Sequence, residues 1–206
     1  MNKIAIIGGS ILKNFQKNNV VFLQRHEGNT PPHKINHKKN IMTLKKQGVG
    51  LIIGVNSVGS LKIKIHPGSI VVPDDYINLF QVQTIFNTRK EHIVPSIDND
   101  LRNKIIKASK KLNLEVHQKG IYFQTIGPRF ETVAEINMIK KFADIVGMTM
   151  GSEATIANEM GIRYASICSV DNYANGISSK QITTKEWEDG IEKNLKNIKK
   201  LIGSLI

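Results

Sequence analysis

The chain has 206 residues, a length that suits one α/β domain with a buried core. Its 29 Lys and Arg against 17 Asp and Glu give a formal net charge of +12, which could suit a nucleic-acid partner. The lysines are scattered, however, and no aromatic-rich strand accompanies them as a base-stacking platform, so we favour a solvated basic surface with some attraction for anionic substrates.

Two features of the sequence bear on the compartment. The first apolar run, at residues 3–7, turns polar after Gly8 and is too short for the core of a signal peptide or for a membrane span. The single cysteine, Cys168, lies in another apolar run, which excludes an internal disulfide and indicates a buried, inert thiol. We expect a soluble, cytoplasmic protein.

Short apolar runs alternate with amphipathic segments along the chain. Runs rich in Ile and Val predict strands at residues 3–7, 20–23, 50–55, 69–72, 120–125, 144–148 and 163–170. Helical periodicity predicts helices at residues 36–46, 99–112, 131–142, 151–160 and 184–205. The apolar stripe of the last helix, from Trp187 to Leu205, favours packing on the sheet over a membrane or partner-binding role. The pattern predicts a single α/β domain over residues 1–206, with a central mixed, largely parallel sheet flanked by helices.

Ligand sites of such sheets lie at the strand ends, and the first predicted strand ends in Gly8-Gly9-Ser10. A dinucleotide-binding G-x-G-x-x-G pattern would need glycine where Ser10 and Lys13 stand, and no acidic ribose partner follows. A simpler interpretation is that the glycines let the backbone approach an anion, to which backbone N–H groups and the Ser10 hydroxyl donate. A turn with no binding role would explain the glycines equally well.

Three further strand ends carry groups suited to an anion. Arg25 and His26 follow the second strand, and the arginine fork matches phosphate oxygens. Small polar residues, 56–60, follow the third strand. Thr149 lies just before the predicted helix that opens near Gly151, where free N–H groups and the helix dipole favour negative charge. Each feature has a bland explanation, but together the four predict a phosphate pocket.

Three polar segments that end apolar runs predict the rest of a binding site: residues 127–135 (GPRFETVAE), 146–149 (VGMT) and 171–173 (DNY). With Ile6 to Ser10, Arg25-His26 and residues 56–61, they occur in the order seen in the trimeric purine nucleoside phosphorylase and methylthioadenosine phosphorylase family. The chain resembles this family over most of its length.

The resemblance implies a role for individual residues. Phosphate-binding positions of the family match Ser10, Arg25, His26, Asn56, Ser57 and Thr149. Nucleoside-binding positions match Phe130, Glu131, Met148, Asn172, Tyr173, Ala174 and His92, the last reaching the 5′ end of the nucleoside in a neighbouring subunit. Catalysis falls to Asn172, Arg25 and His26, and specificity to Glu131, Asn172 and Thr184. The resemblance further implies a homotrimer or a dimer of trimers.

The reaction that the resemblance implies is phosphorolysis, with inorganic phosphate as co-substrate and with no metal or organic cofactor. Positive charge develops on the ribose and negative charge on the departing purine, so phosphate favours the former and Asn172 the latter. Family members that act on 6-aminopurines carry Asp at the position of Asn172 and a second Asp at that of Ala174. Asn172 with Glu131 therefore favours 6-oxopurine nucleosides: inosine, guanosine or 5′-methylthioinosine.

The chain also departs from the family pattern. The segment from Ser10 to Arg25 is shorter than in the relatives, Asp171 stands where threonine is usual, and residues 182–184 lack a histidine that some relatives place there. Alternatives are a 5′-methylthioadenosine phosphorylase, a degenerate purine-binding protein and a basic nucleic-acid-binding module. The retained set of polar residues argues against the last two.

Overall fold

The computed structural model describes residues 3–80, 83–88, 90–179 and 183–206, with the side chains of Thr184, Glu186 and Lys193 also left out. The strands are β1 (Lys3–Gly8), β2 (Val20–Gln24), β3 (Val49–Ser60), β4 (Ile70–Val71), β5 (Asp75–Ile77), β6 (Val116–His117), β7 (Ile121–Gln124), β8 (Ile145–Gly147) and β9 (Arg163–Tyr173). The helices are α1 (His37–Lys46), α2 (Asn99–Lys111), α3 (Val133–Ile139), α4 (Met150–Glu159) and α5 (Thr184–Leu205), with 3-10 turns η1 (Glu27–Asn29) and η2 (Pro32–Lys34).

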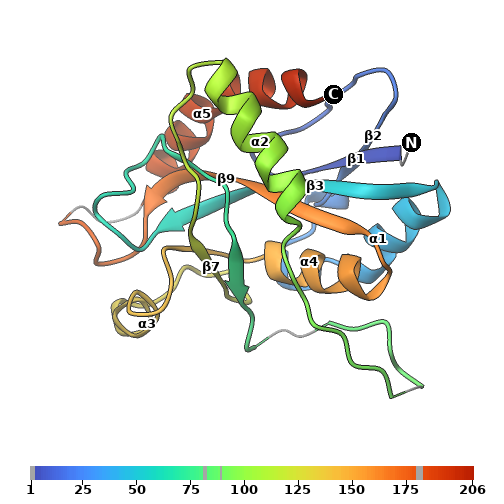
Figure 1. Cartoon of the computed structure of the whole chain (residues 1–206). Helices are drawn as coiled ribbons and strands as arrows, with labels where there is room; N and C mark the ends of the chain where they lie inside the picture. The colour runs from blue at the N-terminus through green and yellow to red at the C-terminus, as the bar shows by residue number, and fades with distance from the viewer. Residues whose placement is uncertain (1–2, 81–82, 89, 180–182) are drawn as a thin grey trace.

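The strands form one mixed, largely parallel sheet in the order β5-β7-β8-β3-β9-β4-β6, with β1 paired to β3 and β2 paired to β1. The first half of β3 pairs with β1 in parallel, and its last two residues pair with β8 in the antiparallel sense. On its other side β3 runs parallel to β9 over almost its whole length. Helices α2 and α5 cover one face of the sheet, whereas α1 and α4 cover the other (Figure 1). The predicted fold class is confirmed.

Two strands are longer than the sequence indicates. Residues 56–60 and 171–173, which the sequence pattern assigns to loops, are the last parts of β3 and β9. Their polar side chains are nonetheless buried, as Asn56, Ser60 and Asp171 show. When only the pattern of apolar residues is considered, polar residues within a strand are assigned to a loop. The pattern does not show the hydrogen bonds that satisfy these residues inside the protein.

Smaller differences concern short elements. Strands β5 and β6 are absent from the prediction because two or three residues carry no periodic signal. Helix α3 begins at Val133 rather than at 131, since the Thr132 hydroxyl accepts from the backbone N–H of Glu135 while the Glu135 carboxylate accepts from the N–H of Thr132. This reciprocal capping box fixes the start of the helix.

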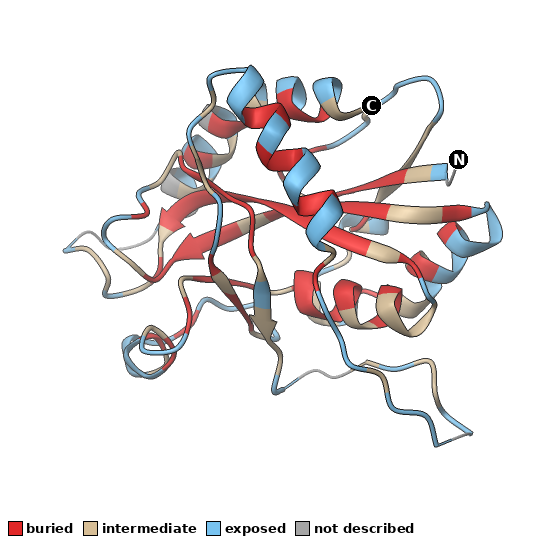
Figure 2. Cartoon of the chain, in the orientation of Figure 1, coloured by how far each residue is buried: buried red, intermediate tan, exposed pale blue. Residues whose placement is uncertain are grey.

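The core lies between the sheet and its helices, as the buried residues in Figure 2 show. Cys168 is fully buried, and burial raises the pKa of its thiol to about 12, which confirms the inert cysteine. The apolar stripe of α5 faces the core at Ile198, Leu201 and Ile202. None of the helices in the described ranges is long and apolar enough to cross a membrane.

The short connection between β1 and β2, residues 9–19 and here named the β1–β2 loop, is held at several points. Ile11 and Leu12 are buried, and the ring of Phe15 lies 6.2 Å from that of Phe22 in β2. The Lys17 ammonium donates to the carbonyl oxygens of Gly203 and Ile206, each at 2.5 Å. A lysine at the carboxyl end of a helix satisfies free carbonyls and complements the dipole. The loop is therefore anchored to the last turn of α5.

Candidate active site

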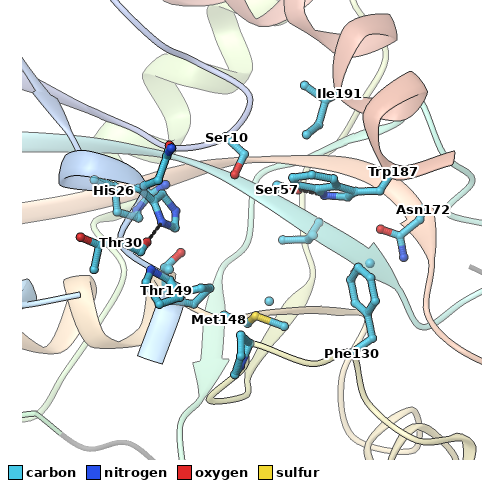
Figure 3. Close-up of a pocket in the computed structure, with 18 of the residues that line it drawn as sticks. Ser10, His26, Thr30, Ser57, Phe130, Met148, Thr149, Asn172, Trp187 and Ile191 are labelled. Carbon is cyan, nitrogen blue, oxygen red and sulfur yellow. Dashed lines mark hydrogen bonds between the residues drawn. The ribbon is translucent and has the colours of Figure 1, made fainter. Parts of the chain in front are cut away.

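One cavity of about 1010 Å³ opens along β3, at the ends of β1, β2, β8 and β9. Its two ends differ in chemistry (Figure 3): Ser10, His26 and Thr149 lie together at one end, and Phe130 and Asn172 lie at the other. Met148 lies between the two ends, and Trp187 and Ile191 of α5 form a further wall. We call the first end the anion end and the second the base end.

At the anion end, Thr149 is oriented by residues behind the cavity wall. Its hydroxyl oxygen accepts from the Asn56 amide at 2.9 Å, and the Asn56 carbonyl oxygen accepts from Ser166 at 2.8 Å. Because the Thr149 oxygen is an acceptor in this chain, its hydrogen remains available to a ligand. Asn56 itself is fully buried and does not line the cavity, so the structure gives it a positioning role in place of the predicted direct contact with phosphate.

Arg25 lines the same end, but most of its guanidinium faces inward. Its Nε and Nη2 atoms donate to the two oxygens of Glu153 at 2.6 and 3.1 Å, and Nη1 donates to the carbonyl oxygen of Val55 at 2.8 Å. Burial alone would lower the pKa of Arg25, but the charge and hydrogen bonds of Glu153 outweigh burial and raise it. The arginine fork therefore holds Glu153, which leaves one Nη1 hydrogen for a ligand.

Glu153 is the centre of a buried cluster that the sequence analysis missed. It is 1% exposed, accepts from the Tyr164 hydroxyl at 2.8 Å and lies 3.8 Å from Nδ1 of His37. Burial lowers the pKa of His37 to about 4, so this ring is neutral at pH 7. The negative charge of Glu153 is therefore paired with Arg25.

The glycines after β1 serve this arrangement. A Cβ on Gly9 would collide with Nη1 of Arg25, and one on Gly8 would collide with the Leu12 carbonyl and the Phe22 ring. The predicted reason for the glycines, close approach of an anion, is therefore replaced by close approach of protein groups. Ser10, the next residue, does line the cavity.

His26 lines the anion end with its ring already engaged. Its Nδ1 lies 2.8 Å from the Thr30 carbonyl oxygen, which requires a hydrogen on Nδ1 and leaves Nε2 for a ligand. Burial lowers the pKa of His26, the bond to Thr30 raises it, and the charges of Arg25 and Lys13 lower it further. In the neutral ring Nε2 is an acceptor, which suits the hydroxyl of a protonated phosphate, whereas only the protonated ring would donate from Nε2.

Three of the backbone N–H groups at the helix N-terminus behind Thr149, which the sequence predicts to be free, donate to side chains of the protein. The backbone N–H groups of Thr149 and Met150 donate to the Tyr122 hydroxyl at 3.1 and 3.2 Å, and that of Ser152 donates to the Gln124 side chain at 3.0 Å. These protein groups satisfy the donors that would otherwise attract an anion. The Thr149 hydroxyl is thus the group of this segment that faces a ligand.

Ser57 connects the cavity wall to α5. Its hydroxyl donates to the Asp171 carboxylate and accepts from the Trp187 indole N–H at 3.0 Å. Asp171 also accepts from Ser169, is 1% exposed and does not line the cavity. Asp171 therefore adds no carboxylate to the cavity wall, because Ser57 and Ser169 donate to it outside the lining. Burial raises the pKa of Asp171 to about 7, against the effect of its hydrogen bonds.

At the base end, an aromatic face lies near a carboxylate and an amide. Phe130 is 45% exposed, which leaves its ring free to stack. Glu131 is 7% exposed, and Thr125 donates to its Oε1 at 2.6 Å, whereas no partner is recorded for Oε2 within the described ranges. The Asn175 amide donates to the Glu131 backbone oxygen at 3.1 Å. Thr125 thus holds the Glu131 carboxylate, and its Oε2 atom remains available to accept a hydrogen bond from a ligand.

Asn172 closes the base end from β9. Its Nδ2 donates to the Tyr173 carbonyl oxygen at 2.8 Å, which leaves one amide hydrogen and the carbonyl oxygen for a ligand. Gly59 lies against it, since a Cβ there would come within 3.3 Å of that nitrogen. Ala174 lines the cavity nearby. Between the ends, Met148 packs on Gly127, whose φ of +72° and contact with the Met148 sulfur both require glycine.

Two further predicted residues, Tyr173 and His92, do not line this cavity. The Tyr173 hydroxyl donates to the carbonyl oxygen of Ile63 at 3.0 Å, away from the lining. His92 is exposed and outside the lining. The side chain of Thr184 and all of residue 182 lie outside the described residues.

Other lining residues escaped the sequence analysis. Trp187 and Ile191 fit the apolar stripe of a packed helix, and nothing in the spacing shows that the stripe continues into a cavity. Lys13 lines the anion end from the β1–β2 loop. The shortened segment between Ser10 and Arg25 is the signal that could have directed attention to Lys13.

The fold is α/β, and the cavity is suited to a ligand with an anion at one end and a flat, polar-edged ring at the other. The family model described as the phosphorylase superfamily matches residues 5–206, and the chain belongs to that family.

Similar proteins carry related names. The chain is 45% identical over 186 residues to a probable 6-oxopurine nucleoside phosphorylase of Archaeoglobus fulgidus, covering 89% of this chain and 76% of that protein. It is 39% identical over 198 residues to a probable S-methyl-5′-thioinosine phosphorylase of Methanocaldococcus jannaschii, covering 93% and 78%. A methylthioadenosine phosphorylase from Schistosoma mansoni solved in complex with adenine has a TM-score of 0.88 at 22% identity, covering 100% of this chain and 91% of that chain, which establishes the shared fold.

Proposed function

We propose that the chain catalyses phosphorolysis of 6-oxopurine nucleosides, namely inosine, guanosine or 5′-methylthioinosine. The products are the free purine and ribose 1-phosphate or its 5-methylthio form. The observation that carries the proposal is the pairing, in one cavity, of Ser10, His26 and Thr149 at one end with Glu131 and Asn172 at the other. The names of the relatives at 39–45% identity agree with it.

The reaction breaks the N-glycosidic bond while a bond forms between a phosphate oxygen and C1′. Phosphate held by Ser10, His26 and Thr149 places negative charge near the developing positive charge of the ribose. Arg25 contributes its one remaining Nη1 hydrogen, since Glu153 and Val55 accept from the rest of its guanidinium. Met148, between the two ends, is suited to contact the ribose. Inorganic phosphate is the co-substrate, and this phosphorolysis needs no metal or organic cofactor.

At the base end the same geometry supports discrimination. The Glu131 Oε2 can accept from N1–H of a 6-oxopurine, and the remaining Asn172 amide hydrogen can donate to O6. The Asn172 oxygen can accept from N7–H as negative charge develops on the leaving purine. A 6-aminopurine offers no hydrogen at N1 and would leave the buried carboxylate unpaired.

We further propose a cytoplasmic role in purine salvage and assembly as a homotrimer or a dimer of trimers, with His92 reaching a neighbouring subunit's nucleoside. Support for self-association comes from exposed apolar side chains on α3 and beside the base end. They are Ile126, Phe130, Val133, Met138 and Phe142. No nucleic acid or membrane partner is proposed.

One experiment tests the reaction and the substrate together. The protein is incubated with inosine, guanosine, 5′-methylthioinosine, adenosine and 5′-methylthioadenosine, with and without phosphate, and the free base is identified by chromatography. Phosphate-dependent release of hypoxanthine or guanine supports the proposal. Adenine alone would establish the 5′-methylthioadenosine alternative, and no base under any condition would favour a degenerate binder.

A further inference from the structure

The charges at the anion end do not add up to a strong site for a phosphate dianion. Arg25 is the cation that the sequence predicts there, yet Glu153 accepts from it through both carboxylate oxygens, at 2.6 and 3.1 Å, with both side chains buried. Buried charges this close cancel most of each other's field at a distance. His26 contributes no charge in its neutral form, which burial favours.

Lys13 is the remaining cation of the cavity wall. Of the residues that line the cavity in the described structure, it is the only lysine, and Arg25 is the only arginine. Its side chain is exposed, with no ion pair recorded inside the described ranges. Its charge contributes to lowering the pKa of His26, which indicates that the ammonium acts at the same end of the cavity. The lining carboxylates, Glu131 and Glu188, belong to the base end and to α5.

The backbone gives Lys13 a defined place. The adjacent Ile11 and Leu12 are buried. Four residues after Lys13, the ammonium of Lys17 donates to carbonyl oxygens at the end of α5. Lys13 thus stands on an anchored loop beside Ser10. The short connection between Ser10 and Arg25 thus carries the lysine that lines the anion end.

We propose that Lys13 is a phosphate-binding residue that supplies the net positive charge of the anion end. The inference rests on the proposed function for its substrate, since phosphorolysis is what requires a bound phosphate. Lys13 then supplies the positive charge that Arg25 does not offer to a phosphate, because Arg25 is paired with Glu153. Nothing in this role touches the purine, so the lysine affects phosphate and not base recognition.

The test replaces the charge and measures phosphate in two ways. Lys13→Gln is compared with wild type for the KM of phosphate in nucleoside cleavage and for the phosphate-dependent rise in Tm without nucleoside, at constant ionic strength set by chloride. Loss of a charge-assisted hydrogen bond should raise the phosphate KM about tenfold or more and reduce the Tm response. The KM of the nucleoside at saturating phosphate should change by less than about twofold, and Lys13→Arg should restore most of the phosphate affinity.

Lys34→Gln is the matched control, because Lys34 is an exposed lysine in η2 that lies outside the lining. This variant also removes one lysine charge from the protein surface, but outside the cavity lining, and should leave the phosphate KM unchanged. Equal phosphate responses in Lys13→Gln and wild type, or equal losses in both variants, would overturn the assignment. If wild type cleaves no nucleoside, the proposed function fails, and the Tm response to phosphate alone still decides for or against Lys13.

Discussion

At the scale of single residues, the site depends on groups that do not line the cavity. Asn56 orients the Thr149 hydroxyl, Thr125 holds Glu131, and Glu153 holds Arg25. Each of these supporting residues is polar and buried or half-buried, so each must be paired to avoid a desolvation cost. The geometry of the ligand-facing atoms is therefore set by the pairing requirements of the interior.

The buried Arg25–Glu153 pair leads to a stability prediction. Glu153→Gln keeps the shape but leaves the Arg25 charge uncompensated, which should lower the free energy of unfolding by about 3 kcal/mol or more. Urea denaturation at pH 7 measures it. Glu27→Gln is the control, since the Lys39–Glu27 pair is exposed, with side chains 61% and 77% accessible, and should cost less than about 1 kcal/mol. Equal losses in the two variants would contradict the buried charge cluster.

Asn172 leads to a specificity prediction. Asn172→Asp should shift preference toward 6-aminopurine nucleosides, because a carboxyl group can accept from the exocyclic amine that the Asn172 amide hydrogen opposes. The ratio of inosine to adenosine turnover is the measurement. Tyr173→Phe is the control, because that hydroxyl bonds Ile63 outside the cavity and should leave the ratio unchanged. A ratio that does not move in Asn172→Asp would show that another residue discriminates.

At the scale of elements, the contact of α5 with β9 is unusually close at one point. The backbone of Gly190 lies so near that of Asp171 that a Cβ would overlap its Cα, C and O atoms. Around this point Trp187 donates to Ser57, and Asn194 donates to Ser169 and to the carbonyl oxygen of Val170. The cavity wall that α5 supplies is thus fixed to the sheet by a glycine contact and by polar side chains on either side of it.

Two glycines of α5 give opposite predictions for the same substitution. Gly190→Ala should lower the free energy of unfolding by about 1–3 kcal/mol, since backbone atoms cannot move aside as a flexible side chain would. Gly203→Ala meets nothing within 4 Å and should raise it by up to about 1 kcal/mol, because alanine favours a helix interior. Urea denaturation of both variants is the measurement. A stable Gly190→Ala protein would show that α5 can shift away from β9 at little cost.

At the scale of the whole molecule, two buried groups give the stability opposite dependences on pH. The Asp171 pKa is raised from 3.8 to about 7, so the folded state keeps a proton that the unfolded state loses, and stability falls as pH rises across that window. The His37 pKa is lowered from 6.5 to about 4, so the unfolded state takes up the proton, and stability rises between those values. Each contribution is on the order of 3 kcal/mol, and they oppose each other between pH 4 and pH 6.5.

Asp171→Asn should expose the histidine contribution. The free energy of unfolding of this variant, relative to that of wild type, should increase as pH rises from about 4 to about 7, because the variant has no carboxyl group to ionise and so does not lose the stability that wild type loses. Urea denaturation at intervals across this range measures it. Asp189→Asn, exposed on α5, is the control and should follow the wild-type profile. Parallel profiles for Asp171→Asn and wild type would mean that Asp171 does not titrate in this window.

The sequence predicted the fold class and the principal helices and strands, because apolar periodicity is strong in α2, α5, β3 and β9. Through the resemblance to a family, the sequence also assigned five residues to one site, and all five line the cavity: Ser10, His26, Thr149, Glu131 and Asn172. It did not predict which polar residues face inward. Asn56 and Asp171 point into the protein whereas Thr149 and Asn172 line the cavity, and the orientation of the first two is set by partners distant in the chain, such as Ser166 and Ser57.

Strand β3 contributes to both ends of the cavity within four residues. Asn56 bonds Thr149 at the anion end, and Gly59 lies against Asn172 at the base end. At about 3.3 Å per residue, the two positions are about 10 Å apart. The spacing between the anion end and the base end is thereby set by one extended strand, whose register is fixed by its neighbours β1, β8 and β9. An enzyme built this way cannot lengthen or shorten its site without re-pairing its central sheet, so new substrates are more readily admitted by changing side chains than by changing dimensions.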